Sequence, residues 1–179
     1  MDTNCKHKKC ILDIETTSFT PWEPGRIICI GIKDVESGAI TVFHDKNEEA
    51  LLIQFFQYFN KMNYREIIGY NISFDIRFIF SRCLLYKVPA CNFFAITYVD
   101  LMMILKGVNK GYNFNQPGTL NEWSIFLFGK GKLFENTQVP LLYQQGRIQE
   151  IIEYNENDLE LTYTLWKRIK VVLDGNSNN

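Results

Sequence analysis

Three features are missing from this sequence, and each absence excludes a class of protein. No apolar run approaches the ~20 residues that a membrane-spanning helix requires. Residues 1–9 are polar and hold no apolar stretch of the kind found in secretion signals. The cysteines number five, and an odd count without a secretion signal argues against a disulfide framework. We therefore expect a cytoplasmic protein with no membrane partner.

A strong net charge is also missing. The chain has 19 Lys and Arg against 20 Asp and Glu, which gives a formal charge of −1. Nucleic-acid-binding domains are typically recognised by a strongly basic surface. The overall charge therefore does not by itself indicate a nucleic-acid partner.

The sequence does contain enough apolar material for one folded core. Apolar residues make up 46% of the 179 residues and charged residues 22%, which is typical of globular proteins and not of disordered chains. We expect one domain over residues 1–179, with a basic tail at 1–9 and a frayed end at 175–179. Cys5, His7 and Cys10 lack the second half of a zinc site, so a mobile tail is the favoured interpretation.

The apolar pattern predicts strands first and helices later. Short apolar runs bounded by turn residues predict strands at 10–14, 27–32, 39–43, 67–69 and 95–99. Helix starts are predicted at the N-cap candidates Asn47 and Ser73 and at a capping box formed by Thr119 and Glu122. A last amphipathic helix is expected from about Ile148 to Leu173.

This order of elements predicts an α/β fold. The hairpin turn at Glu36-Ser37-Gly38 joins two of the first three strands, which indicates an antiparallel meander. The later strands alternate with helices and should pair in parallel. We expect a mixed five-stranded sheet with helices on both faces. The polar segment from Lys106 to Gly118 is expected to be a loop that approaches a ligand.

Two acidic residues stand together in the first predicted strand. Asp13 and Glu15 are two residues apart, so both project from the same face, within apolar surroundings. Adjacent carboxylates of this kind repel each other, and a bound metal ion usually offsets this repulsion. A strand end where the acids are simply solvated is the equal alternative for this segment alone.

Two further acids occupy helices. Asp75 follows a short apolar strand and lies in a first helical turn, where a favourable interaction with the helix dipole is the ordinary explanation. Asp158 lies four residues after Tyr154 and shares the inward stripe with Ile151 and Leu165. A carboxylate on a packed face needs a partner, either a metal ion or a buried ion pair or cap.

Together these segments resemble one family of enzymes. The motifs are Asp13-x-Glu15, Asn71-x-x-x-Asp75 and Tyr154-x-x-x-Asp158. Their order and spacing are similar to those of the DEDD 3′–5′ exonucleases, tyrosine subclass, and most of all to the proofreading domains of family B DNA polymerases. The resemblance runs from about Cys10 to Leu173 and implies a ribonuclease H-like fold, which agrees with the predicted order of elements.

The resemblance also implies a mechanism. Asp13, Glu15, Asp75 and Asp158 would hold two divalent cations, Mg²⁺ or Mn²⁺, that activate water and stabilise the departing 3′ oxygen. Tyr154 would orient the attacking water, since a phenol with an ordinary pKa of about 10 is a poor base at neutral pH. The products would be nucleoside 5′-monophosphates.

Substrate contacts are expected near these acids. By resemblance, Thr16 and Asn71 would contact the terminal nucleotides, and Phe19 would separate the last bases. Phe74 is a further stacking candidate, although core packing is an equal alternative for both phenylalanines. Contacts to phosphate are candidate roles for Lys130 and Lys132, with a solvated loop as the alternative, and Asp100 is expected to support the site without a catalytic role.

Three functions remain open from the sequence. The favoured one is an exonuclease that degrades the 3′ end of single-stranded DNA. The alternatives are an exoribonuclease that trims RNA 3′ ends and a catalytically silent nucleic-acid-binding domain of the same fold. The chain has little room for a polymerase, so a separate polymerase or repair protein is a possible partner.

Overall fold

The computed structural model describes residues 7–22, 24–107 and 117–175. The strands are β1 (Lys8–Thr16), β2 (Ile27–Asp34), β3 (Ile40–His44), β4 (Tyr64–Gly69) and β5 (Thr97–Asp100). The α-helices are α1 (Glu48–Met62), α2 (Ile72–Tyr86), α3 (Leu101–Leu105), α4 (Leu120–Phe128), α5 (Val139–Gln144) and α6 (Ile148–Leu173). Two 3₁₀ helices, η1 (Phe93–Ala95) and η2 (Asn136–Gln138), complete the described elements. None of the helices in these ranges is long and apolar enough to cross a membrane.

The five strands form one mixed sheet in the order β3-β2-β1-β4-β5. β1 pairs with β2, and β2 with β3, in antiparallel fashion, whereas β4 pairs in parallel with both β1 and β5. The hairpin between β2 and β3 turns at Gly38, which has a φ of 74° and donates its N–H to the Asp34 carbonyl oxygen. The predicted mixed sheet is therefore confirmed.

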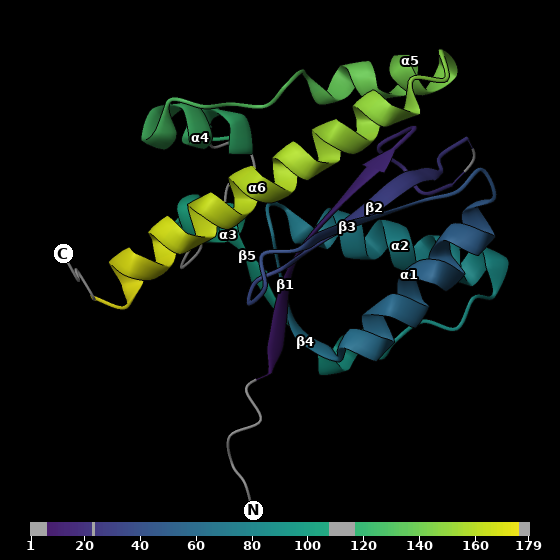
Figure 1. The fold of residues 1–179 in the computed structure, drawn as a ribbon, viewed down its shortest axis with the longest axis horizontal. Coiled ribbons are helices and arrows are strands. Elements are labelled where there is room, and N and C mark those ends of the chain that lie inside the picture. Colours follow the sequence, from purple (N-terminus) through teal and green to yellow (C-terminus); the bar gives the residue numbers. More distant parts are fainter. Residues whose placement is uncertain (1–6, 23, 108–116, 176–179) are drawn as a thin grey trace, which may run out of the picture.

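Helices cover both faces of the sheet, as predicted. Leu12 and Ile14 of β1 point to the face where α1 and α2 pack, while Ile11 points to the face that α6 covers. Figure 1 shows α6 running diagonally across β1 and β2, with α4 and α5 beside it and with α1 and α2 on the far side of the sheet. β1 is thus buried between two helical layers.

The N-terminal end differs from the prediction where the structure describes it. β1 begins at Lys8, and Lys9 forms an ion pair of 2.9 Å with Glu66 of β4. The prediction of a basic tail at 1–9 is therefore wrong for Lys8 and Lys9, which belong to a strand. Cys10 is fully buried in the core, which removes it from any tail metal site. Residues 1–6 of the predicted tail, Cys5 included, lie outside the described residues, as do 176–179 of the predicted frayed end.

The turn into α2 corrects the predicted cap. The helix begins at Ile72, so Ser73 lies inside its first turn and the prediction of Ser73 as N-cap is wrong. The cap position is Asn71, whose φ of 63° is left-handed and whose side chain caps no backbone group. Asparagine tolerates this conformation better than most residues. Asp100 supports the turn because its Oδ1 accepts the Asn71 N–H at 2.9 Å.

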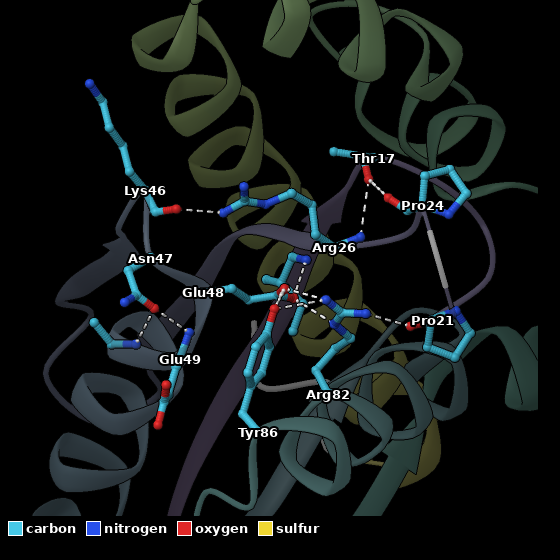
Figure 2. A network of polar contacts seen from close by, with 12 residues as sticks. Thr17, Pro21, Pro24, Arg26, Lys46, Asn47, Glu48, Glu49, Arg82 and Tyr86 are labelled. Carbon is cyan, nitrogen blue, oxygen red and sulfur yellow. Dashed lines mark hydrogen bonds and ion pairs between the residues drawn. The ribbon is translucent and has the colours of Figure 1, made fainter.

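A buried ion pair secures the connection between β1 and β2. Arg82 of α2 donates to both carboxylate oxygens of Glu48, at 3.0 and 2.6 Å, and both side chains are almost fully buried. Figure 2 shows this pair beneath the connection, with the Arg82 guanidinium also donating to the Pro21 carbonyl oxygen at 2.8 Å. Glu48 accepts the Ile27 N–H at 2.6 Å. The pair therefore ties α1 and α2 to the segment that follows Thr16.

Candidate active site

β1 delivers two carboxylates to the face of the sheet that α6 covers. Side chains alternate along a strand, so Asp13 and Glu15 share the face on which Ile11 packs with Leu159 of α6. β4 pairs with β1 only as far as Ile11 opposite Ile68. Asp13 and Glu15 therefore lie beyond the end of β4, where the sheet edge opens.

Helix α6 brings a third carboxylate to the same place. Asp158 lies one turn after Tyr154, and both side chains are buried. One carboxylate oxygen from each of Asp13, Glu15 and Asp158 lies within 4.8 Å of the others. One oxygen of Asp158, Oδ1, is buried and has no hydrogen-bond partner among the described residues. Buried carboxylates this close to one another repel strongly. The cluster is therefore suited to bind a cation.

Asp75 approaches the cluster from the other side of the sheet. It is buried in the first turn of α2, and its Oδ1 accepts the Ile14 N–H at 3.0 Å. This hydrogen bond satisfies a backbone N–H in the part of β1 that β4 leaves unpaired. Asp75 lies outside the group of three carboxylates. Burial raises its pKa, and the nearby charge of Asp13 raises that pKa further.

Lys132 places an ammonium group against these carboxylates. Its Nζ contacts Asp158 Oδ2 and donates to the Tyr154 hydroxyl at 2.9 Å and to Asn136 Oδ1 at 3.0 Å. The Lys132 N–H donates to Asn121 Oδ1 at 2.9 Å, which fixes the loop after α4. The positive charge offsets part of the repulsion within the cluster.

The protonation of the cluster follows from burial and crowding. Burial, and then the charge of Asp158, raises the pKa of Asp13 from 3.8 to about 7. Burial raises the pKa of Glu15 well above its ordinary value, with Asp13 and Asp158 adding to the effect. The Lys132 charge acts in the opposite direction on both groups. Each group therefore holds a proton more readily in the folded protein than in the unfolded chain.

In metal-free buffer, we expect the protein to lose stability as the pH rises from 5.5 to 8. Because its pKa is raised on folding, Asp13 binds more proton in the folded state over this range, so the free energy of unfolding falls with rising pH. Asp13 alone contributes a fall of about 2 kcal/mol between pH 5.5 and 8. Calorimetric melting at both ends of the range measures the change, and Mg²⁺ or Mn²⁺ should restore stability at pH 8. A melting temperature that is equal at both pH values, or an Asp13→Asn variant with an unchanged slope, contradicts the expectation.

The carboxylates open into a pocket of about 590 Å³ that reaches from β1 to α2 and α4. Of the predicted substrate contacts, Asn71 and Phe74 line this pocket, whereas Thr16 and Phe19 do not. Phe19 is 71% exposed on the β1–β2 connection. Phe74 also packs on Phe78, with a ring-centroid distance of 5.7 Å. The structure therefore separates the predicted contacts into two inside the pocket and two outside it.

Sequence reasoning missed part of the site. It offered Lys130 and Lys132 equally as phosphate contacts, but Lys130 is exposed and only Lys132 lines the pocket. It did not identify Asn136, which lies between Lys132 and the Tyr154 hydroxyl, or Asn155, which donates to Asp13. A signal for Asn155 was present, because it lies on the buried stripe of α6 as Asp158 does.

The fold and the acidic pocket at β1 define an RNase H-like nuclease architecture. A family model described as RNase_H superfamily matches residues 10–170, and the chain belongs to that superfamily. An uncharacterized protein of Methanocaldococcus jannaschii is 31% identical over 170 residues, which cover 89% of this chain and 93% of that protein. The structure of the family B DNA polymerase from Pyrobaculum calidifontis aligns with a TM-score of 0.75 at 16% identity. That alignment covers 91% of this chain and 24% of the polymerase chain, so this protein spans about a quarter of the polymerase.

Proposed function

We propose that the protein is a metal-dependent 3′–5′ exonuclease that releases nucleoside 5′-monophosphates from single-stranded DNA. The observation that carries the proposal is the convergence of Asp13, Glu15 and Asp158 within 4.8 Å, next to the Tyr154 hydroxyl and the Lys132 ammonium. The structural likeness to a family B DNA polymerase supports the proposal, since the motifs resemble those of the proofreading domains of such enzymes. Residues 1–179 would form a single exonuclease domain.

The carboxylate cluster suits Mg²⁺ or Mn²⁺. Its donors are hard oxygens, which these ions prefer, and the unpartnered Asp158 Oδ1 gives a buried lone pair that a cation would satisfy. Asp13, Glu15 and Asp158 would be the principal ligands, with Asp75 as the fourth acid of the site. When bound, the ions lower the pKa of water and stabilise the negative charge of the reacting phosphate.

Tyr154 is suited to orient water and not to remove its proton. Burial, followed by the charges of Asp158 and Glu15, raises the pKa of the phenol far above its ordinary value, so the hydroxyl stays protonated. The ring stacks on Phe134 with a centroid distance of 4.2 Å, which fixes its direction. The hydroxyl accepts from Lys132 and donates to Asn136. A fixed, protonated hydroxyl can hold the attacking water in line with the phosphate.

Lys132 is suited to bind the scissile phosphate or to stabilise the charge that develops on it. Its side chain is largely buried. Burial acts to lower its pKa, but the charges of Asp158, Asp13 and Glu15 and the hydrogen bond to Asp158 together raise that pKa, so the group remains an ammonium. The terminal nucleotide would lie in the pocket between Asn71 and Phe74. Thr16 and Phe19 would contact the strand outside the pocket.

Degradation of end-labelled single strands tests this function. We expect a 3′-labelled strand to lose its label first, as a 5′-mononucleotide, and only with Mg²⁺ or Mn²⁺ present. A 5′-labelled strand of the same sequence should shorten progressively. Release of the 5′ label first, or cleavage that continues in excess chelator, contradicts the proposal.

The same assay separates the alternatives. RNA of the same sequence cleaved much faster than the DNA would make the protein an RNA-trimming exonuclease. Tight binding of the strand without metal-stimulated cleavage would make it a silent nucleic-acid-binding domain. Adding a polymerase or a repair protein to the reaction tests whether the activity serves a separate partner.

A further inference from the structure

Asn155 makes a contact that neither the motifs nor the proposed mechanism uses. It lies on α6 between Tyr154 and Asp158, and its side chain has no exposed surface. Its Nδ2 donates to Asp13 Oδ2 at 2.7 Å. A buried amide that reaches from α6 to the first acidic residue is a specific link between the two elements that form the carboxylate cluster.

A glycine on the neighbouring strand makes room for this link. Gly31 of β2 is the direct antiparallel partner of Asp13 in the sheet register. A Cβ at Gly31 would lie 2.0 Å from Asn155 Oδ1 and 2.7 Å from Leu159 Cδ1. Glycine weakens a strand interior and often marks a close approach of another group, and here that group is the Asn155 amide. Gly31 and Asn155 are therefore two parts of one arrangement around Asp13.

The Asn155 side chain is poorly explained by packing alone. Its Oδ1 is buried and has no hydrogen-bond partner within the described residues. A buried acceptor without a partner costs stability, whereas an apolar side chain of the same shape would not carry that cost. The feature that a leucine at this position would lack is the N–H group directed at Asp13.

We propose that Asn155 is a positioning residue for Asp13. With Oδ2 held by the amide, the Asp13 carboxylate cannot turn freely, so its oxygens keep their places beside those of Glu15 and Asp158. This role rests on the proposed function, because it presumes that Asp13 is a metal ligand. Groups that orient a metal ligand commonly change metal affinity or activity by 10- to 100-fold when they are removed.

The test is metal binding by an Asn155→Leu variant, measured by calorimetric titration with Mn²⁺ in the absence of nucleic acid. We expect Mn²⁺ to bind about 10- to 100-fold more weakly than to the wild-type protein. The matched control is Asn157→Leu, the same change two residues along α6. Within the described residues the Asn157 side chain makes no hydrogen bond to Asp13, and its Oδ1 also lacks a partner. This control should bind Mn²⁺ as the wild type does.

A kinetic readout distinguishes positioning from general damage. We expect Asn155→Leu to need about 10- to 100-fold more Mn²⁺ for half-maximal cleavage, with most of the wild-type kcat recovered at saturating Mn²⁺ and little change in KM for the strand. Gly31→Ala is the second variant, because its added methyl group would push the Asn155 amide away although the substitution removes no polar group from the protein. It should show the same weakening of Mn²⁺ binding.

Wild-type Mn²⁺ affinity in a folded Asn155→Leu protein overturns the proposal. If that variant shows no cooperative melting transition, Gly31→Ala decides, and wild-type Mn²⁺ affinity there overturns the proposal equally. Neither result affects the proposed function if the wild-type protein binds Mn²⁺ and cleaves. Absence of both Mn²⁺ binding and cleavage in the wild-type protein is the distinct outcome that removes the proposed function and this role together.

Discussion

An Asp158→Asn protein is expected to lose about 10³-fold or more in exonuclease rate. Asp158 belongs to the group of three close carboxylates and contacts Lys132, so its charge lies at the centre of the site. Metal-assisted stabilisation of the reacting phosphate contributes several kcal/mol, and each 1.36 kcal/mol is about tenfold in rate. The initial rate of mononucleotide release from a 3′-labelled strand measures the loss.

Stability measurements separate this loss from misfolding. Burial raises the pKa of Asp158, which means that its ionised form is disfavoured in the folded protein, so a neutral amide should leave the melting temperature unchanged or raised in metal-free buffer. The matched control is Glu156→Gln on the exposed side of α6, two residues away, which should cleave at the wild-type rate. An Asp158→Asn protein that cleaves within a few-fold of wild type would show that the carboxylate cluster is not the reaction centre.

The fold could be predicted because local patterns and tertiary structure agree in most elements. The apolar stripe of the last helix matched α6 from Ile148 to Leu173, and the capping box at Thr119 and Glu122 is present. The fifth strand was less predictable. The sequence indicated residues 95–99, but Phe93–Ala95 forms a 3₁₀ helix and β5 runs over Thr97–Asp100. A short edge strand pairs on one side only, so tertiary contacts decide its ends.

The acids of the site could be predicted, but the groups that organise them could not. Asp13, Glu15 and Asp158 occupy positions where a regular strand or helix fixes the direction of the side chain. Lys132 belongs to a loop, and its direction depends on a hydrogen bond to Asn121, eleven residues earlier in the chain. The role of Asn155 depends on Gly31, and only the sheet register reveals that Gly31 lies opposite Asp13. Loop direction and strand register are long-range properties that spacing does not encode.

The largest expected loss of stability comes from Arg82→Met, which should lower the free energy of unfolding by about 3–5 kcal/mol. The substitution leaves the Glu48 carboxylate buried without its cation and the Pro21 carbonyl oxygen without its donor (Figure 2). For a domain of this size the change corresponds to a melting temperature about 6–20 °C lower. Urea unfolding and calorimetric melting at pH 7 measure the two quantities.

The matched control is Arg147→Met. Arg147 also pairs with a glutamate, Glu150, but both side chains are roughly half exposed, at 48% and 46%. An exposed pair of this kind contributes little to stability because water screens it, so Arg147→Met should melt close to the wild-type temperature. If both arginine variants lose the same stability, burial of the Glu48–Arg82 pair does not explain its contribution to the free energy of unfolding.

Removing both members of the pair completes the test. A Glu48→Leu/Arg82→Met protein should recover part of the loss, since no charge remains buried without a partner. Recovery should be incomplete because Glu48 also accepts the Ile27 N–H and Arg82 also donates to Pro21, and both backbone groups lose their partners. These are the groups that fix the connection following Glu15 and Thr16, so the double variant should bind a single strand more weakly even where its stability returns. A double variant less stable than Arg82→Met alone would show that the two side chains act independently.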